Sequence, residues 1–126
     1  MTSTSNGVVE KYFDRLVAHD FDGVAETLTD DIERIGPFGD VKSGLGEYLV
    51  FLADLMPRLP GYSMDVHRVV YGEGIGLAEI TETIEVDGSK IPTPEALVFD
   101  LAADGRISKI QIYIQRLSEE VPTLAR

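Results

Sequence analysis

The sequence predicts an α+β domain in which three helices are followed by a curved antiparallel sheet. The main evidence is a change of hydrophobic period. Apolar residues recur with a helical period of about 3.6 before Gly61 and with a strand period of about 2 after it. Glycine-containing turn signals then divide the second half into four strands, as in an antiparallel meander.

The first half contains two predicted helices and a short strand. The first helix covers residues 7–19, with Ser5 or Asn6 as its expected N-cap. Its apolar side chains form two rows, which are Val8, Tyr12 and Leu16, and Val9, Phe13 and Val17. A second helix is predicted over residues 22–28, and a brief strand over residues 32–38 is broken by a Gly-Pro pair.

A third helix leads into the sheet. Ser43 or Gly44 opens this helix, which stops before Pro57. Its apolar stripe consists of Leu45, Tyr48, Leu49, Leu52, Leu55 and Met56. The four predicted strands cover residues 62–71, 75–86, 89–101 and 106–117. The turn signals between them are Gly72-Glu73-Gly74, Asp87-Gly88 and Asp104-Gly105.

The composition excludes several classes of protein. The 126 residues fit one domain over the whole chain, with a core at 6–117 and a tail at 118–126. Without cysteine there is no thiol nucleophile and no zinc–cysteine site. No signal peptide and no run of roughly 20 apolar residues is present, so we expect a cytoplasmic protein without a membrane partner.

The charge and the motifs narrow the possible ligands. A net charge of −11 repels phosphate backbones, so we expect no nucleic-acid partner and favour a small hydrophobic ligand. The glycines at 72, 74 and 76 do not connect a strand to a helix, and no metal-binding or serine-nucleophile motif occurs. We therefore expect no cofactor and no metal.

Two glutamates interrupt apolar rows on neighbouring strands. Along residues 77–86, one face of the strand is formed by Ala78, Ile80, Glu82, Ile84 and Val86. The next strand presents Glu95, Leu97, Phe99 and Leu101 on one face. A carboxylate removed from water must be paired, hydrogen-bonded or protonated, and such a group often serves chemistry or ligand binding.

The turns place the two glutamates on the same face. If residues 87–88 form a two-residue hairpin loop, Glu82 lies opposite Thr93 and Ile80 lies opposite Glu95. The two glutamates are then diagonal neighbours about 7–8 Å apart at the backbone. Their surroundings resemble an apolar pocket with a few convergent polar groups.

A two-residue loop at residues 104–105 extends this face to the last strand. Glu95 then lies opposite Ile114, and Phe99 lies opposite Ile110. The apolar residues gathered around the carboxyl groups are Ile80, Ile84, Leu97, Phe99, Ile110, Ile112 and Ile114. From the first half of the chain, the expected ligand-binding residues are Arg34, Phe38, Tyr48 and Leu52.

Several of these residues have a second interpretation. Glu82 could reach water at a strand end or form a buried ion pair with Arg34 or Arg68. Arg34 either faces the pocket or lies on the surface. His67 alternates with Asp65, Val69 and Tyr71 and is expected to face outward from a more apolar side of Met64, Val66 and Val70. The loop of residues 72–74 leaves the register uncertain, and a different loop length would bring His67 inward. His19, at the end of the first helix, is expected to be structural.

The order of these elements resembles a known superfamily. The stretch GVVEKYFDRLVAHDFDGVAETLTDDIERIGPFG resembles the opening of the nuclear-transport-factor-2-like, or SnoaL-like, superfamily. The remainder, from GLGEYLVFLADL to ISKIQIYIQR, is similar to limonene-epoxide hydrolases and ketosteroid isomerases. The resemblance implies a cone-shaped curved sheet wrapped by three helices, as in the cystatin-like fold. It also implies a deep pocket and a homodimer.

The catalytic positions of these enzymes carry over unevenly. Tyr12 matches the tyrosine that ketosteroid isomerases place on the first helix, and Glu95 occupies the place of their protonated aspartate. Their general base lies just before the Pro-x-Gly turn, where this chain has Gly36. Glu82 matches the first acid of the Asp–Arg–Asp group of limonene-epoxide hydrolases. Ile80 replaces the arginine of that group and Ile112 replaces its second aspartate.

The leading hypothesis is a cofactor-independent acid–base enzyme: an isomerase, cyclase or lyase that acts on a small hydrophobic polyketide, steroid or terpenoid. Glu82 is the expected base, and Glu95 and Tyr12 are the expected proton and hydrogen-bond donors. Tyr12 could instead simply pack on the sheet. One alternative is a limonene-type epoxide hydrolase with a rearranged site. Another, suggested by Gly36, is a non-catalytic ligand-binding or dimerisation module.

Overall fold

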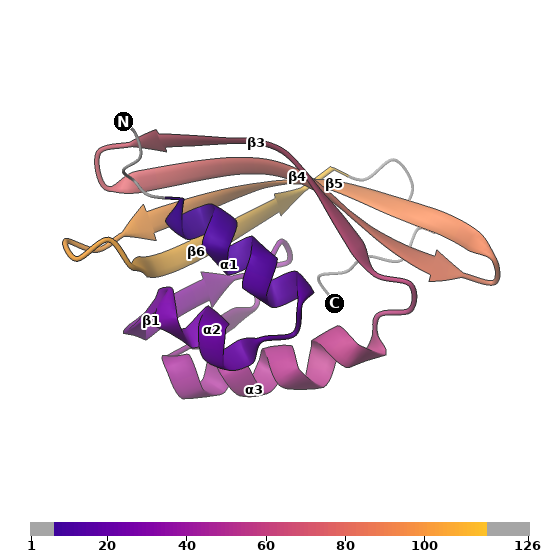
Figure 1. The fold of residues 1–126 in the computed structure, drawn as a ribbon, viewed down its shortest axis with the longest axis horizontal. Helices are drawn as coiled ribbons and strands as arrows, with labels where there is room; N and C mark the ends of the chain where they lie inside the picture. Colours follow the sequence, from indigo (N-terminus) through magenta and orange to yellow (C-terminus); the bar gives the residue numbers. More distant parts are fainter. Residues whose placement is uncertain (1–6, 116–126) are drawn as a thin grey trace.

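The computed structural model describes residues 7–115 and shows the expected α+β fold, a curved six-stranded sheet with three helices (Figure 1). The strand order is β2-β1-β6-β5-β4-β3. The helices are α1 (Val8–Val17), α2 (Phe21–Glu26), α3 (Leu45–Leu55) and the short 3-10 helix η1 (Met56–Arg58). The strands are β1 (Leu28–Ile35), β2 (Val41–Ser43), β3 (Ser63–Gly72), β4 (Ile75–Val86), β5 (Ser89–Leu101) and β6 (Ile107–Ile114).

The helix boundaries follow local chemistry. Gly7 precedes α1, whereas the expected caps Ser5 and Asn6 lie outside the described residues, as does the expected tail at 118–126. Asp20 caps α2 by accepting a hydrogen bond of 3.0 Å from the backbone N–H of Gly23. Of the two residues expected to open α3, Gly44 is its N-cap.

β1 differs from its predicted extent and has a partner that the sequence did not indicate. It begins at Leu28 rather than Ile32 and lies parallel to β6, with Arg34 opposite Ile110. The sheet is therefore antiparallel except at this one pair. Because β1 and β6 are far apart in the sequence, no turn signal marks their pairing. The pairing brings Arg34 to the inner face, beside the helices.

The β4–β5 hairpin has the predicted register. Asp87 and Gly88 both have positive φ, 52° and 80°, as a tight two-residue turn between twisted strands requires. Glu82 lies opposite Thr93, and Ile80 lies opposite Glu95. The prediction that both glutamates share one face of the sheet is confirmed.

The β5–β6 register is also as predicted for the residues from Glu95 to Asp100, with Glu95 opposite Ile114. The connecting loop, however, is longer than two residues, because Leu101 pairs with Ile107. A bulge between Asp100 and Leu101 absorbs the difference, so the distant pairs keep their register.

A second bulge changes the faces of β3. Val66 lies opposite Ile80, and Arg68 lies opposite Glu79, which leaves His67 as the extra residue. His67 is exposed and on the outer face, as expected. Beyond the bulge the predicted faces are reversed: Val69 and Tyr71 are half-buried, whereas Val70 is exposed. Val66 is exposed as well.

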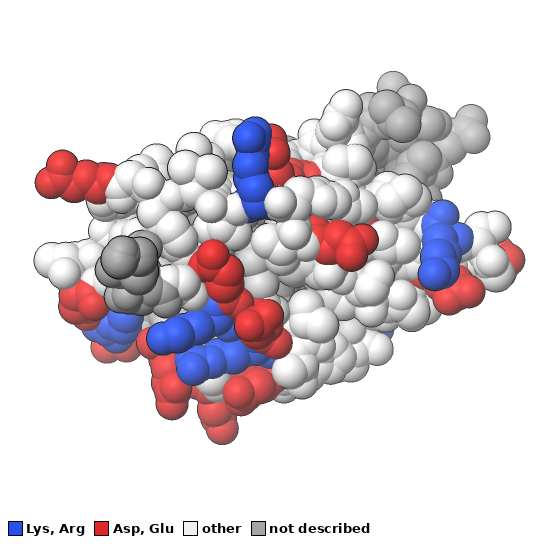
Figure 2. Space-filling view, turned by 45° about the horizontal axis from the view of Figure 1, so that its top comes forward, with Lys and Arg blue, Asp and Glu red and all other residues white. Residues whose placement is uncertain are grey.

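The core lies between the helices and the inner face of the sheet. Tyr12 and Phe13 of α1 both contact the ring of Phe99 edge-on, at centroid distances of 5.9 and 5.8 Å. The helices cover one side of the sheet, and the β4–β5 hairpin extends beyond them (Figure 1). On the face shown in Figure 2, basic side chains lie beside acidic ones and do not form a patch of their own.

Candidate active site

A partly open cavity of about 50 Å³ lies between α1, α3 and the inner face of the sheet. Its polar side chains come from elements distant in sequence: Tyr12, Arg34, Tyr48, Glu82 and Glu95. Its apolar lining consists of Phe13, Leu16, Phe51, Leu52, Leu55, Met56, Leu59, Met64, Ile80, Leu97 and Ile112. The cavity is therefore apolar with a few convergent polar groups, the composition typical of ligand sites.

The two glutamates form a carboxyl pair with different surroundings. Glu95 is 8% exposed, whereas Glu82 is only partly buried. Burial raises the pKa of Glu95 to about 11; a hydrogen bond with Glu82 and the charge of Glu82 act in the same direction, and the charge of Arg34 opposes them. At neutral pH Glu95 therefore carries a proton and can donate it.

Tyrosine hydroxyls surround this pair. The hydroxyl of Tyr62 donates a hydrogen bond to Oε2 of Glu82, and the hydroxyls of Tyr12 and Tyr48 are hydrogen-bonded to each other. Burial is the main cause that raises the pKa of each of these three tyrosines. All three hydroxyls consequently stay protonated at neutral pH. Because a hydroxyl donates one hydrogen bond, the proton of Tyr62 is used by Glu82, and one of Tyr12 and Tyr48 donates to the other.

Arg34 contributes a buried cation to the cavity wall. Its side chain is 5% exposed, and its Nη1 lies 2.9 Å from Oδ2 of Asp40. The guanidinium carbon lies 4.9 Å from the centre of the Phe51 ring, which supplies a cation–π contact. Of the two positions left open for Arg34, the structure shows the one that faces the pocket, and its ion pair is with Asp40 rather than with either glutamate.

Most of the predicted site residues meet in the cavity. These are Tyr12, Arg34, Tyr48, Leu52, Ile80, Glu82, Glu95, Leu97 and Ile112. Strand alternation had placed the members of β4, β5 and β6 on the correct face, and the hairpin register brought them to the same level.

Five predicted ligand-binding residues do not line the cavity. Phe38 is 54% exposed in the loop before β2. Phe99 and Ile110 are fully buried in the core away from the cavity, and Ile84 is buried nearer the β4–β5 turn. Ile114 lines a groove on the other side of the sheet. The alternation of side chains defines a face, but it does not say how far along each strand a cavity extends.

Tyr62 is the main polar residue that the sequence analysis missed. It shares the alternation of Met64, which lies directly opposite Glu82 and lines the cavity. The register of β3 and β4 could have revealed Tyr62 as a diagonal neighbour of Glu82, but the length of their turn left that register open. Phe51 and Leu59 were missed as well, because they lie outside the predicted apolar stripe of the third helix.

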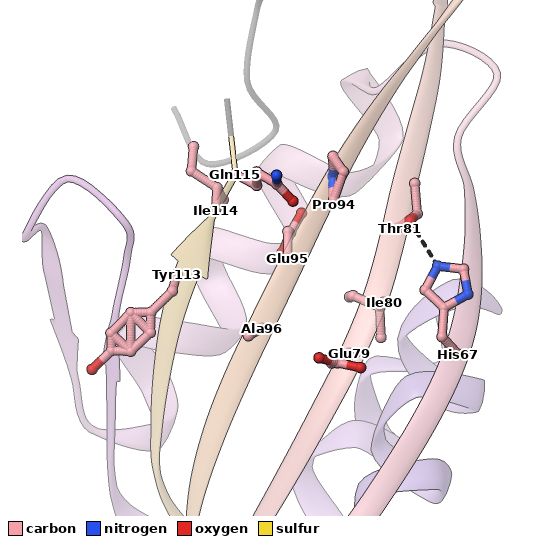
Figure 3. A pocket seen from close by; sticks show the side chains of 10 residues that line it. All are labelled: His67, Glu79, Ile80, Thr81, Pro94, Glu95, Ala96, Tyr113, Ile114 and Gln115. Carbon is pink, nitrogen blue, oxygen red and sulfur yellow. Dashed lines mark hydrogen bonds between the residues drawn. The ribbon is translucent and has the colours of Figure 1, made fainter. Parts of the chain in front are cut away.

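A shallow groove of about 420 Å³ opens on the other side of the sheet, and Ile80 and Glu95 of the cavity line it as well (Figure 3). His67 lines it, with its Nε2 2.7 Å from Oγ1 of Thr81. Glu79 of the same groove forms an exposed ion pair with Arg68. No acidic group orients the His67 ring in the part of the chain that the structure describes, so the contact with Thr81 is not arranged as a nucleophile–base pair.

Two further structural findings concern metal binding and membrane-spanning helices. Among residues 7–115, no three His, Asp or Glu side chains are arranged to hold a metal ion. No helix of that range has the length and apolarity needed to cross a bilayer.

Solved structures with the same fold include three enzyme-like proteins. An LEH-like epoxide hydrolase from M. tuberculosis is 23% identical, with 88% of this chain and 82% of that chain covered and a TM-score of 0.76. A proposed SnoaL-like polyketide cyclase from Jannaschia is 20% identical, covering 91% of each chain, with a TM-score of 0.78. A proposed ketosteroid isomerase from Kribbella flavida is 20% identical, covering 94% and 83%, with a TM-score of 0.76. At such identities the likeness establishes the fold alone.

No curated protein matches the chain. A family model for the SnoaL-like domain, in contrast, matches residues 9–110. This range contains all of α1 except its first residue, both glutamates and the first half of β6. The chain therefore belongs to the family of SnoaL-like domains.

Proposed function

We propose that this protein is an acid–base enzyme, an isomerase, cyclase or lyase, that acts on a small uncharged molecule in the inner cavity. The observation that carries the proposal is the carboxyl pair of the cavity, in which the buried Glu95 holds a proton beside the partly buried Glu82. A proton donor and a carboxylate at one apolar site are the two groups needed to move a proton to and from carbon.

The proposed reaction begins at a carbon next to a carbonyl group. The Glu82 carboxylate takes the proton from this carbon, and the electrons of the C–H bond move to the carbonyl oxygen to form an enolate. The Glu95 carboxyl group and the Tyr12 hydroxyl donate hydrogen bonds to that oxygen. In a β,γ-unsaturated ketone Glu82 then returns the proton to the γ-carbon as the double bond shifts into conjugation, which gives an isomer. In a compound with a second carbonyl group the enolate carbon instead attacks that carbonyl, the ring closes, and the new alkoxide takes the proton from Glu82.

The cavity limits the substrate. Its volume of about 50 Å³ is several times smaller than the roughly 300–1,000 Å³ of sites for drug-sized ligands. A polyketide, steroid or terpenoid fits only if the side chains that line the cavity move apart. The proposal therefore favours a compact carbonyl compound over the larger substrates.

Substitution of the proposed base tests this function. Glu82→Gln keeps the shape and removes the carboxylate, so we expect proton exchange at the substrate's carbon to fall at least about 100-fold with the fold unchanged. Exchange is measured by NMR in D₂O on compact ketones. Glu79→Gln, on the other face of the same strand, is the matched control. Full activity of Glu82→Gln would refute the assignment.

Epoxide hydrolysis is the second candidate. At about 10–15 Å³ for each water, the cavity has room for about three to five water molecules next to Glu82. Glu82 would then activate one water while Glu95 protonates the epoxide oxygen. Incorporation of ¹⁸O from labelled water into a diol tests this reaction. Ligand binding without product from either substrate class would indicate a non-catalytic binding module.

We also propose a homodimer formed through the outer face of the sheet. Val70, Leu77 and Tyr113 are 51%, 44% and 48% exposed, which leaves apolar side chains in water on an otherwise highly charged protein. Pairing of this face with a second copy would bury them.

A further inference from the structure

The buried Arg34 presents an electrostatic problem for the cavity. The residues around it with titratable side chains are Tyr12 on α1, Tyr48 on α3, Glu82 on β4, Glu95 on β5, and Asp40 and Lys42 at the start of β2. A cation in this position attracts both glutamates. Its charge already opposes the protonation of Glu95. Without compensation, Arg34 would favour the ionised form of Glu95 and remove its proton.

Asp40 supplies that compensation from outside the cavity. Its Oδ2 lies 2.9 Å from Nη1 of Arg34, while Asp40 itself is not part of the lining. The Phe51 ring covers the guanidinium as well. The two contacts hold the arginine at the wall, and the Asp40 carboxylate, which lies outside the cavity lining, offsets its charge.

The turn before β2 is built to bring Asp40 to this place. Gly36 donates its N–H to the carbonyl oxygen of Asp40 at 2.8 Å, and Gly39 has a φ of 84°, which favours glycine. A Cβ on residue 36 would overlap the Asp40 carboxyl group, so only glycine at position 36 leaves room for it. The carboxylate thus occupies the space that a side chain at position 36 would fill.

One oxygen of this carboxylate is not satisfied. Oδ1 of Asp40 is buried and has no hydrogen-bond partner within residues 7–115. A buried oxygen in that condition is unfavourable for folding. Its retention beside Arg34 indicates that the charge of the carboxylate matters at this position.

We propose that Asp40 is a positioning residue that fixes Arg34 at the cavity wall and offsets its charge, so that Glu95 remains a proton donor. This inference rests on the proposed function, which gives the proton of Glu95 its role. It assigns Gly36 a role too: its lack of a side chain admits the carboxylate that sets the electrostatics of the site.

The test follows the protonation of Glu95 directly and needs no substrate. Protein labelled with ¹³C at the glutamate carboxyl carbon is titrated by NMR, and the Glu95 signal is the one absent from Glu95→Gln. In Asp40→Asn we expect the titration midpoint of Glu95 to fall by at least about one pH unit, because Arg34 is no longer neutralised. Gly36→Ala displaces the Asp40 carboxylate sterically and should shift the midpoint in the same direction.

The matched control is Asp54→Asn, which removes an aspartate from an exposed ion pair with Arg58 and should leave the midpoint unchanged. A midpoint that stays at its wild-type value in both Asp40→Asn and Gly36→Ala overturns the inference, as does loss of folding in both variants, since Asp40 would then be structural. If Glu95 is already ionised at pH 7 in the wild-type protein, the proposed function fails instead. The two failures are therefore distinguishable.

Discussion

Replacement of Glu95 by glutamine should change how the stability of this protein depends on pH. Glutamine has nearly the same shape as protonated glutamic acid but never ionises. In the wild-type protein the pKa of Glu95 is raised from 4.5 to about 11, so between these values the folded chain binds one proton more than the unfolded chain. The stability contributed by this group is complete below pH 4.5 and is lost progressively as the pH rises toward 11.

The magnitude depends only on Glu95 remaining protonated in the folded state. At pH 7 the unfolded carboxyl group is about 2.5 pH units above its ordinary pKa of 4.5. Each unit corresponds to about 1.36 kcal/mol, so the wild-type protein gives up about 3.4 kcal/mol between low pH and pH 7. The Glu95→Gln variant does not lose this stability. Its free energy of unfolding relative to the wild type should therefore rise by about 1.4 kcal/mol per pH unit.

Urea unfolding followed by circular dichroism at pH 5, 6, 7 and 8 measures this slope. Glu79→Gln, an exposed glutamate on the opposite face of the sheet, should show a difference from the wild type that barely changes over the same range. A constant difference for Glu95→Gln would mean that Glu95 is ionised in the folded protein. The argument from burial, and the donor role of Glu95 with it, would then be refuted.

Three further predictions concern stability and assembly. Tyr71→Phe removes the hydroxyl contacts with Glu10 and with the N–H of Val9, so the free energy of unfolding should fall by about 1–2 kcal/mol in urea titrations. Phe99→Ala opens a cavity under α1 and should cost about 3–5 kcal/mol by the same measurement. Leu77→Lys should convert a dimer into a folded monomer in sedimentation experiments; a monomeric wild-type protein would contradict the dimer proposal.

The meeting of Glu82 and Glu95 could be predicted because it depends on one local feature. The Asp87-Gly88 turn specifies a two-residue loop, and strand pairing then transmits the register along both arms. The β5–β6 prediction survived an incorrect loop length only because the bulge at Asp100 and Leu101 compensated for it. The register of a hairpin can be predicted reliably where the turn residues specify the length of the loop.

The missed features depend on contacts that no local pattern encodes. The bulge at His67 reverses the faces of the second half of β3, and nothing in the alternation of this strand marks it. The parallel pairing that brings Arg34 to the cavity joins segments distant in sequence. Tyr62 could be placed beside Glu82 only once the register of β3 was known.

Gly36 shows that a comparison of residue types at one position can mislead about whether a carboxylate is present nearby. Among related isomerases a base is expected before the Pro-x-Gly turn, so Gly36 suggests that a carboxylate has been lost. The structure instead places the Asp40 carboxylate against Gly36, on the inner side of the turn. Because this carboxylate is engaged with Arg34, it is poorly suited to accept a proton from a substrate, and the base that we propose lies on another strand. Glu82, hydrogen-bonded by Tyr62 and next to a protonated neighbour, is the carboxylate whose surroundings suit that task.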